Sequence, residues 1–333
     1  MEDFDFEEER VRQEIRKFEA RRVLIQLPEG LKPKALQVAK TIEEMGVLPI
    51  VSADPCYGAC DLAATEAENL KVDMIIHYGH SKLMKHERIP TIYVEARAIQ
   101  HVDSVIGKAL RKLEKYHTIG LVTTVQHVQT LDEVREILIR AGKTVVIGDT
   151  GRLGYPGQVI GCDYTNATSV AKNAEAFLFI GGGRFHALGV ALSTSKPTIL
   201  ADPYDMTAFS VNKDAERIRR QRWSVIKEAE KARTFAVLIG LKRGQEKMEE
   251  ALHIKEKFAE HGRTTYLFAA RNITPEALMN FPGVDAFINT ACPRLSIDDG
   301  KTFRRPFLTI NEAKVVIGES SWGELCQKGL LER

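Results

Sequence analysis

The sequence has no apolar run that approaches the ~20 residues of a membrane-spanning helix. It also lacks an excess of charge of one sign, because 47 Lys and Arg residues against 45 Asp and Glu residues give a formal net charge of +2. Binding to nucleic acid requires a concentrated basic face, and the one short basic run, 216–223, is typical of the solvated side of a helix. We therefore expect no membrane insertion and no nucleic-acid partner.

Cysteine is sparse, and no C-x₂-C pair of the kind common at zinc sites occurs. The odd total of five in a chain of 333 residues argues against a disulfide framework. The first 22 residues are charged from the start and contain no apolar signal-peptide core, so we expect a cytoplasmic protein whose thiols stay reduced. Metal ligands, a catalytic thiol and buried small side chains all remain open. The cysteines are Cys56, Cys60, Cys162, Cys292 and Cys326.

The sequence does contain a pattern that occurs three times. Short apolar, β-rich runs at 22–27, 118–124 and 235–241 each precede a helix-period segment that ends in Gly, and a second strand follows. Each repeat continues with a short helix, a third apolar strand and a closing strand. Near-continuous apolar strands that alternate with helices indicate parallel sheets covered on both faces.

We therefore predict an α/β protein with three pseudo-equivalent domains, each a mostly parallel sheet flanked by helices. The segment 205–233 is expected to form a long helix that leads from the second domain to the third. The domains are expected to pack around a common axis, with their functional edges inward. Their expected bounds are 1–115, 116–220 and 221–333.

Functional residues of such sheets collect in loops beyond the carboxyl ends of the strands. Cys60 follows the second predicted strand of the first domain, Cys162 the second strand of the second domain, and Cys292 the third strand of the third domain. Each domain thus sends one thiol to the same edge. Cys56 is close enough to Cys60 to be a ligand, but the turn between them can also direct it elsewhere, and Cys326 is expected to be structural on a terminal helix.

Three thiolates from distant segments suit zinc or an iron–sulfur cluster. A cubane cluster ordinarily takes four cysteines, so three would leave one iron open to a small molecule. An open iron of this kind is typical of a catalytic cluster rather than of a plain electron carrier.

Several motifs resemble those of the archaeal diphthamide-biosynthesis enzymes, the 2-(3-amino-3-carboxypropyl)histidine synthases. They are "DPCYGACDL", "IGCDYTNA", "GGGRFHALG" and "NTACPRLSIDD", together with "IQLPEGL" near the start. The likeness extends over essentially the whole chain. It implies a homodimer of three-domain chains in which Cys60, Cys162 and Cys292 hold a 4Fe–4S cluster. Cys56 departs from the family pattern, which we expect to have another residue there, and it stays an alternative ligand.

The resemblance also implies a reaction. The open iron would bind the methionine part of S-adenosylmethionine, and an electron donor would reduce the cluster. The bond from sulfur to the methionine γ-carbon would then break, and the 3-amino-3-carboxypropyl radical would add to a histidine imidazole carbon of translation elongation factor 2. The usual C-x₃-C-x₂-C triplet of radical S-adenosylmethionine enzymes is absent here.

Residues near the predicted cluster are candidates for binding the cofactor. Gly181, Gly182 and Gly183 leave the third strand of the second domain, where backbone amides can cradle a carboxylate. His186 is a candidate hydrogen-bond donor to the same carboxylate. Ordinary turn glycines and a structural histidine would give the same pattern.

A second group of candidates lies at the ends of other strands. Asp202 occupies the matching edge of the second domain, and Arg294, Asp298 and Asp299 follow the third cysteine as supporting or docking residues. A turn that could meet the amino group or ribose of the cofactor includes Gln26, Pro28, Glu29 and Gly30. Helix-start chemistry alone would also explain Pro28 and Glu29.

Two other functions remain open at this stage. Quinolinate synthase-like enzymes also combine three α/β blocks with three cysteines, but their cluster acts as a Lewis acid for dehydration. A non-enzymatic small-molecule-binding module with a structural zinc would account for the cysteines as well. The loop motifs favour the diphthamide interpretation over both.

Overall fold

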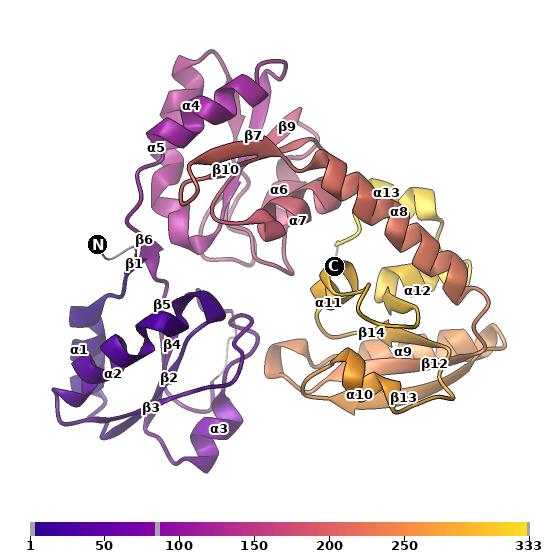
Figure 1. The fold of residues 1–333 in the computed structure, drawn as a ribbon, viewed down its shortest axis with the longest axis horizontal. Coiled ribbons are helices and arrows are strands. Elements are labelled where there is room, and N and C mark those ends of the chain that lie inside the picture. Colours follow the sequence, from indigo (N-terminus) through magenta and orange to yellow (C-terminus); the bar gives the residue numbers. More distant parts are fainter. Residues whose placement is uncertain (1–3, 84–86, 332–333) are drawn as a thin grey trace.

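Three mostly parallel β-sheets form the framework of the computed structural model, which describes residues 4–83 and 87–331 (Figure 1). The sheets belong to three lobes that lie at the corners of a triangle, in chain order from indigo to yellow (Figure 1). The predicted α/β architecture with repeated parallel sheets is confirmed.

The first lobe contains a four-stranded parallel sheet in the order β3-β2-β4-β5. Its strands are β2 (Arg22–Gln26), β3 (Leu48–Val51), β4 (Met74–Tyr78) and β5 (Thr91–Val94). Its helices are α1 (Glu8–Lys17), the 3₁₀ helix η1 (Glu29–Lys34), α2 (Ala35–Glu43) and α3 (Ala64–Asn69). The short strand β1 (Phe4–Asp5) pairs with β6 (Arg97–Ala98) where the chain leaves this lobe.

The second lobe repeats this order and adds one antiparallel edge strand, giving β11-β10-β9-β7-β8. Its strands are β7 (Thr118–Thr123), β8 (Thr144–Val146), β9 (Ala176–Ile180), β10 (Thr198–Asp202) and β11 (Thr207–Ser210). Its helices are α4 (Asp103–Lys112), η2 (Val125–Thr130), α5 (Leu131–Arg140), α6 (Thr165–Val170) and α7 (Arg184–Thr194).

The third lobe has the order β13-β12-β14-β15, again with the first strand of the repeat between the second and third. Its strands are β12 (Thr234–Gly240), β13 (Thr264–Ala270), β14 (Ala286–Asn289) and β15 (Phe307–Thr309). Its helices are η3 (Arg243–Gln245), α9 (Met248–Glu260), α10 (Pro275–Met279), α11 (Pro293–Asp298), α12 (Ile310–Val316) and α13 (Trp322–Lys328).

The repeat extends to individual hydrogen bonds at the amino ends of the strands. Asp73 Oδ2, just before β4, accepts from the amides of Arg21 and Arg22 at the start of β2, at 2.7 and 2.8 Å. Glu175 accepts from the two amides at the start of β7, and Asp285 from the two at the start of β12. An acidic residue therefore fixes the first strand of each lobe to the third.

The long helix expected over 205–233 is shorter than predicted. Helix α8 spans Asn212–Ala229, and the residues before it form the edge strand β11 instead. The β-favouring Thr207 and Phe209 lie in this strand, and Phe209 pairs with Leu200 of β10. These residues therefore pair with the open edge of the sheet at β10 instead of extending α8 toward its amino end.

Helix α8 packs on two lobes. Ile218 belongs to the apolar core of the second lobe and Ile226 to that of the third. The chain end returns to the second lobe as well, because Leu330 and Leu331 lie in its core. A division of the chain at 220/221 falls within α8, and the domain bounds stay a prediction. Among the described helices, none is both long and apolar enough to pass through a membrane.

Candidate functional site

Three cysteines lie in loops beyond strand ends, one in each lobe, and we call Cys60, Cys162 and Cys292 the three loop cysteines. Cys60 lies after β3, Cys162 after β8, and Cys292 immediately before α11 after β14. All three are partly exposed, whereas Cys56 is only 3% exposed. Each of the three loop cysteines thus follows the strand after which the sequence placed it.

The loop of Cys60 is packed against the third lobe. Its carbonyl accepts a 3.0 Å hydrogen bond from the amide of Gly244 in η3, and its Sγ lies 3.5 Å from Gln245 Nε2. A Cβ added to Gly244 would lie 2.5 Å from the Cα of Cys60, so this approach requires glycine. The first and third lobes thus meet directly at one of the loop cysteines.

Cys292 lies in a loop that hydrogen bonding holds in place. Burial raises the pKa of the Cys292 thiol, and the charge of a Cys60 thiolate would raise it further. Asn289 fixes this loop, because its Nδ2 donates to the carbonyl of Cys292 at 2.7 Å. Burial also raises the pKa of Cys60.

Arg294 connects the third lobe to the Cys162 loop of the second lobe. Its guanidinium donates to the carbonyl of Phe185 at 2.9 Å and lies 3.8 Å from the centre of that ring. It also lies 3.4 Å from the hydroxyl of Tyr164, two residues after Cys162. Burial raises the pKa of Tyr164, and both Cys162 and Cys292 interact with it electrostatically. Arg294, a buried cation, therefore joins the Cys292 loop of the third lobe to the residue that follows Cys162 by two positions in the second lobe.

The carboxylate of Asp298 neutralises this cation at 2.6 Å, in the position where a supporting residue was expected. Asp299 has a different place, since its carbonyl accepts from the amide and hydroxyl of Thr302 in the turn after α11. Cys326 lies on α13, and its carbonyl accepts from Ser195 Oγ at 2.7 Å.

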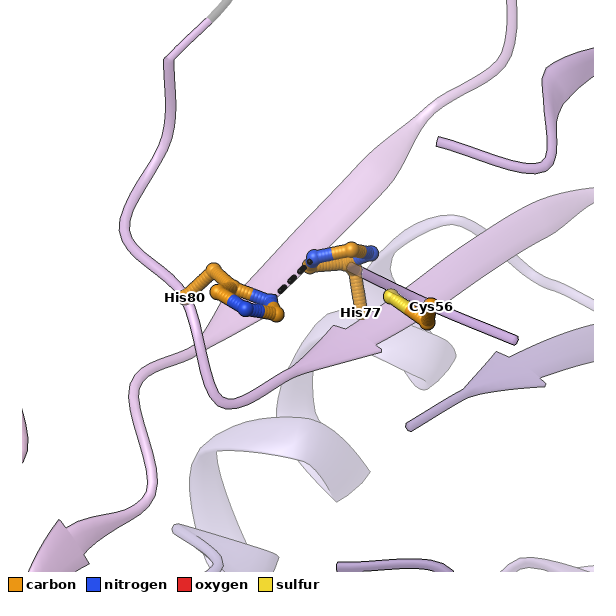
Figure 2. A group of neighbouring side chains, drawn as sticks. All are labelled: Cys56, His77 and His80. Atoms are coloured by element: carbon orange, nitrogen blue, oxygen red, sulfur yellow. Dashed lines mark hydrogen bonds between the residues drawn. The ribbon is translucent and has the colours of Figure 1, made fainter. Parts of the chain in front are cut away.

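The donor set fits an iron–sulfur cluster with one open iron. Three partly exposed thiols come from three lobes, and Cys56 is buried beside two histidines (Figure 2). Thiolate ligands and one missing cysteine are what an open cubane cluster needs.

The glycine triplet forms the turn from β9 into α7. Gly181 and Gly183 have φ values of 147° and 71°, which favour glycine. Asp202 holds this turn, because its Oδ2 accepts from the amide of Gly183 at 2.9 Å. Asp202 is thus occupied by backbone amides of the second lobe, while Gly182 and Gly183 remain exposed.

His186 lies on the first turn of α7. It stacks on Phe179 and meets the edge of Phe185. Burial lowers its pKa to about 3, with Arg294 and His80 contributing, so its imidazole is neutral at neutral pH. A neutral imidazole can donate one hydrogen bond to a bound carboxylate.

The turn after β2 divides into residues with different surroundings. Gln26 is buried and holds the loop after Cys60, since its Nε2 donates to the carbonyl of Asp61 at 2.7 Å. Glu29 begins η1 and pairs with Lys32 at 2.6 Å on the surface. Pro28 packs so closely on Gly79 that a Cβ there would lie 2.8 Å away. Gly30 has no neighbour within 4 Å of its Cβ position.

His77 and His80 were not predicted to be site residues. They belong to the run "IIHYGH", which is typical of a buried strand, so the sequence pattern alone did not indicate that the two histidines could be ligands. In the structure they lie next to Cys56 at the carboxyl end of β4 (Figure 2). Two histidines three residues apart at a strand end, beside a cysteine loop, were the available signal.

Comparison with known proteins assigns the family. A model described as "Putative diphthamide synthesis protein" matches residues 27–326. This chain belongs to the diphthamide synthesis protein family. The resemblance found in the loop motifs is confirmed over most of the sequence.

Relatives in this family share most of their length with the chain. The 2-(3-amino-3-carboxypropyl)histidine synthase of Pyrococcus horikoshii is 38% identical over 92% of this chain and 88% of the relative. Subunit 1 of the human enzyme of that name is 29% identical over 96% of this chain and 73% of the relative. The crystal structure of Dph2 from Pyrococcus horikoshii with a 4Fe-4S cluster superposes with a TM-score of 0.87 at 35% identity, covering 95% of this chain and 92% of that one.

Proposed function

We propose that this chain is a 2-(3-amino-3-carboxypropyl)histidine synthase. It transfers the 3-amino-3-carboxypropyl group from S-adenosylmethionine to a histidine imidazole carbon of translation elongation factor 2, the first step of diphthamide biosynthesis. Family membership supports this activity. The observation that supports it is that three partly exposed thiols, one from each lobe, follow strand ends in loops that Gly244 and Arg294 connect across the lobes.

The three loop cysteines would hold the 4Fe–4S cluster, as their number and accessibility suit a cubane with an open iron. When bound, the cluster supplies the electron that breaks the bond between sulfur and the γ-carbon of S-adenosylmethionine. The protein supplies orientation and burial. Gly244 and Gln245 support Cys60, and Arg294 holds the loops of Cys162 and Cys292 together.

The glycine triplet and His186 would bind the methionine carboxylate of the cofactor. Gly182 is exposed just before the start of α7, where the helix dipole favours a negative charge, while the amide of Gly183 donates to Asp202. Asp202 contributes by fixing the turn. Pro28, Glu29 and Gly30 stay proposed contacts for the amino group or ribose, and Gln26 would act by holding the Cys60 loop.

The reaction needs partners beyond the cofactor. Elongation factor 2 supplies the acceptor histidine, and an electron donor must reduce the cluster. We propose that the chain works as a homodimer in the cytoplasm, where free thiols are kept reduced. Three domains with the bounds 1–115, 116–220 and 221–333 would each contribute one ligand.

An anaerobic assay tests this function. The purified chain is loaded with iron and sulfide, reduced with dithionite, and incubated with S-adenosylmethionine labelled in the aminocarboxypropyl group and with elongation factor 2 from an archaeon. We expect methylthioadenosine and label on the factor. Absence of methylthioadenosine from a cluster-loaded protein would favour dehydratase chemistry, and a colourless protein that holds only zinc would reject both enzymes.

A further inference from the structure

Cys56, His77 and His80 form a cluster of potential ligands that the proposed reaction does not use. Cys56 lies in the loop after β3, and His77 lies in β4. His80 is the second residue after the end of β4. One ligand atom from each residue lies within 4.8 Å of those of the other two (Figure 2). Cys56 and His77 are buried, with 3% and 0% exposure.

Gln26 fixes which nitrogen of His77 carries hydrogen. Its amide orientation is set, because Nε2 donates to the carbonyl of Asp61 and Oε1 accepts from the amide of Ala63 at 3.1 Å. Oε1 must therefore also accept from His77 Nδ1, which lies 2.9 Å away. The other ring nitrogen, Nε2, then presents a lone pair, as a metal-ligating histidine with a hydrogen-bonded partner does.

The two imidazoles are spaced as ligands of one ion. His77 Nε2 lies 3.0 Å from His80 Nδ1, so a single hydrogen on His80 Nδ1 occupies the space between them when no ion is bound. Tetrahedral zinc with Zn–N bonds of 2.0–2.1 Å holds two nitrogens about 3.3 Å apart. An ion can replace this hydrogen if His80 carries its proton on Nε2 instead.

The charge states also suit a metal. Burial lowers the pKa of His77 well below its ordinary value and that of His80 to about 4, so both are neutral ligands at neutral pH. Burial raises the pKa of Cys56 to about 12, so its thiol is protonated until a cation binds. Zinc deprotonates a coordinating thiol outright.

The loop that carries His80 is held in place by the second lobe. Gln126 Nε2 donates to the carbonyl of Gly79 at 2.7 Å, and Gln158 Nε2 donates to Ser81 Oγ at 2.9 Å. These bonds lie on both sides of His80. The ligand geometry is therefore preorganised rather than dependent on a free loop.

We propose that Cys56, His77 and His80 bind one divalent transition-metal ion, best matched by Zn²⁺, at a site separate from the three loop cysteines. One thiolate and two imidazoles are a donor set that zinc favours. Three protein ligands leave a fourth position for water or a substrate group.

The test must keep the ion away from the three loop cysteines, which would themselves bind zinc. In the full chain all three are replaced by Ala, and Co²⁺ is titrated as a spectroscopic probe. We expect one Co²⁺ per chain with a thiolate-to-cobalt charge-transfer band that Zn²⁺ abolishes. Adding Cys56→Ala should remove this band, whereas adding Cys326→Ala, the matched control, should retain it. No cobalt binding, or binding that survives Cys56→Ala, overturns the proposal.

A second measurement applies if the triple variant does not fold by circular dichroism. The protein with all its cysteines is loaded anaerobically with its cluster and dialysed against Zn²⁺, and zinc and iron are counted per chain. Cys56→Ala should lower zinc by one per chain and leave iron unchanged. Loss of iron instead would show that Cys56 serves the cluster, and an unchanged zinc content would show that it binds no ion; either result refutes the site.

Discussion

Lys242 Nζ lies 2.7 Å from Asp61 Oδ2, and both side chains are 8% exposed. The lysine follows the first strand of the third lobe, and the aspartate follows Cys60 in the first lobe. This buried ion pair therefore joins two lobes next to a loop cysteine. Lys242 also covers the ring of Tyr57 at 4.3 Å.

Removing one partner of this pair should destabilise the chain. Asp61→Asn would leave the Lys242 ammonium buried and unpaired, at a cost of about 3–5 kcal/mol. Urea unfolding measures this cost. The double variant Asp61→Leu/Lys242→Met should recover most of it, because no charge is then buried. If the double variant is as unstable as Asp61→Asn, the loss comes from packing of the loop and not from the ion pair.

The cysteines should separate into two groups on substitution. Ala at any of the three loop cysteines should abolish both the cluster and methylthioadenosine release, because a ligand is lost. Cys326→Ala should leave both unchanged. Cys56→Ala should retain the cluster, since this thiol is buried beside His77 and His80. Iron and sulfide counts per chain with the visible absorption spectrum measure this, and a full cluster in Cys60→Ala would contradict the ligand assignment.

Gly244→Ala should weaken the hold on the cluster without unfolding the chain. The new Cβ would lie 2.5 Å from Cys60 Cα and 3.0 Å from its carbonyl oxygen, so η3 must move away. We expect faster loss of iron to a chelator. Gly107→Ala is the matched control, because no atom lies within 4 Å of its Cβ position and Ala in a helix stabilises by roughly 0.5–1 kcal/mol. Equal rates of iron loss in the two variants would refute the role of this contact.

The strands and helices of the three sheets could be predicted because the patterns that indicate them are short stretches of sequence. Apolar runs and Gly helix stops recur in each of the three lobes, and they indicate strands that alternate with helices in a mostly parallel sheet. The same logic placed the loop cysteines at strand ends. It could not predict that Gly244 packs on Cys60 or that Arg294 lies on Phe185, since these contacts depend on how separate lobes meet. The helix predicted through Thr207 was wrong for a similar reason, because only the folded sheet offers an edge for β11.

The acid dependence of stability should reveal the repeated carboxylates at the strand starts. Backbone hydrogen bonds from Arg22 and Arg21 lower the pKa of Asp73, and those from Thr234 and Arg233 lower that of Asp285. A carboxyl with a lowered folded pKa stabilises above its unfolded pKa, and this contribution is lost as the pH falls through the folded value.

Asp73→Asn should therefore be less stable than the parent chain at neutral pH, and this difference should shrink as the pH falls below the unfolded pKa of Asp, about 3.9, and through the lower folded pKa. Urea midpoints measured across this range test the expectation, with Asp54→Asn in the exposed loop after β3 as the control. A difference that stays constant with pH would mean that Asp73 acts by shape and not by charge.

Gly182→Val should weaken cofactor binding while the cluster stays intact. A Cβ at Gly182 would lie 3.0 Å from the ring of Tyr204, and the larger Val side chain would cover the exposed backbone of this residue just before α7. Loss of one hydrogen bond to a charged carboxylate costs about 1.5–3 kcal/mol, which raises the Kd about tenfold or more. Calorimetry of S-adenosylmethionine binding to the anaerobic, cluster-loaded protein measures this change. Because the loop cysteines are untouched, iron content should equal that of the parent chain, and an unchanged Kd would remove the glycine triplet from the cofactor site.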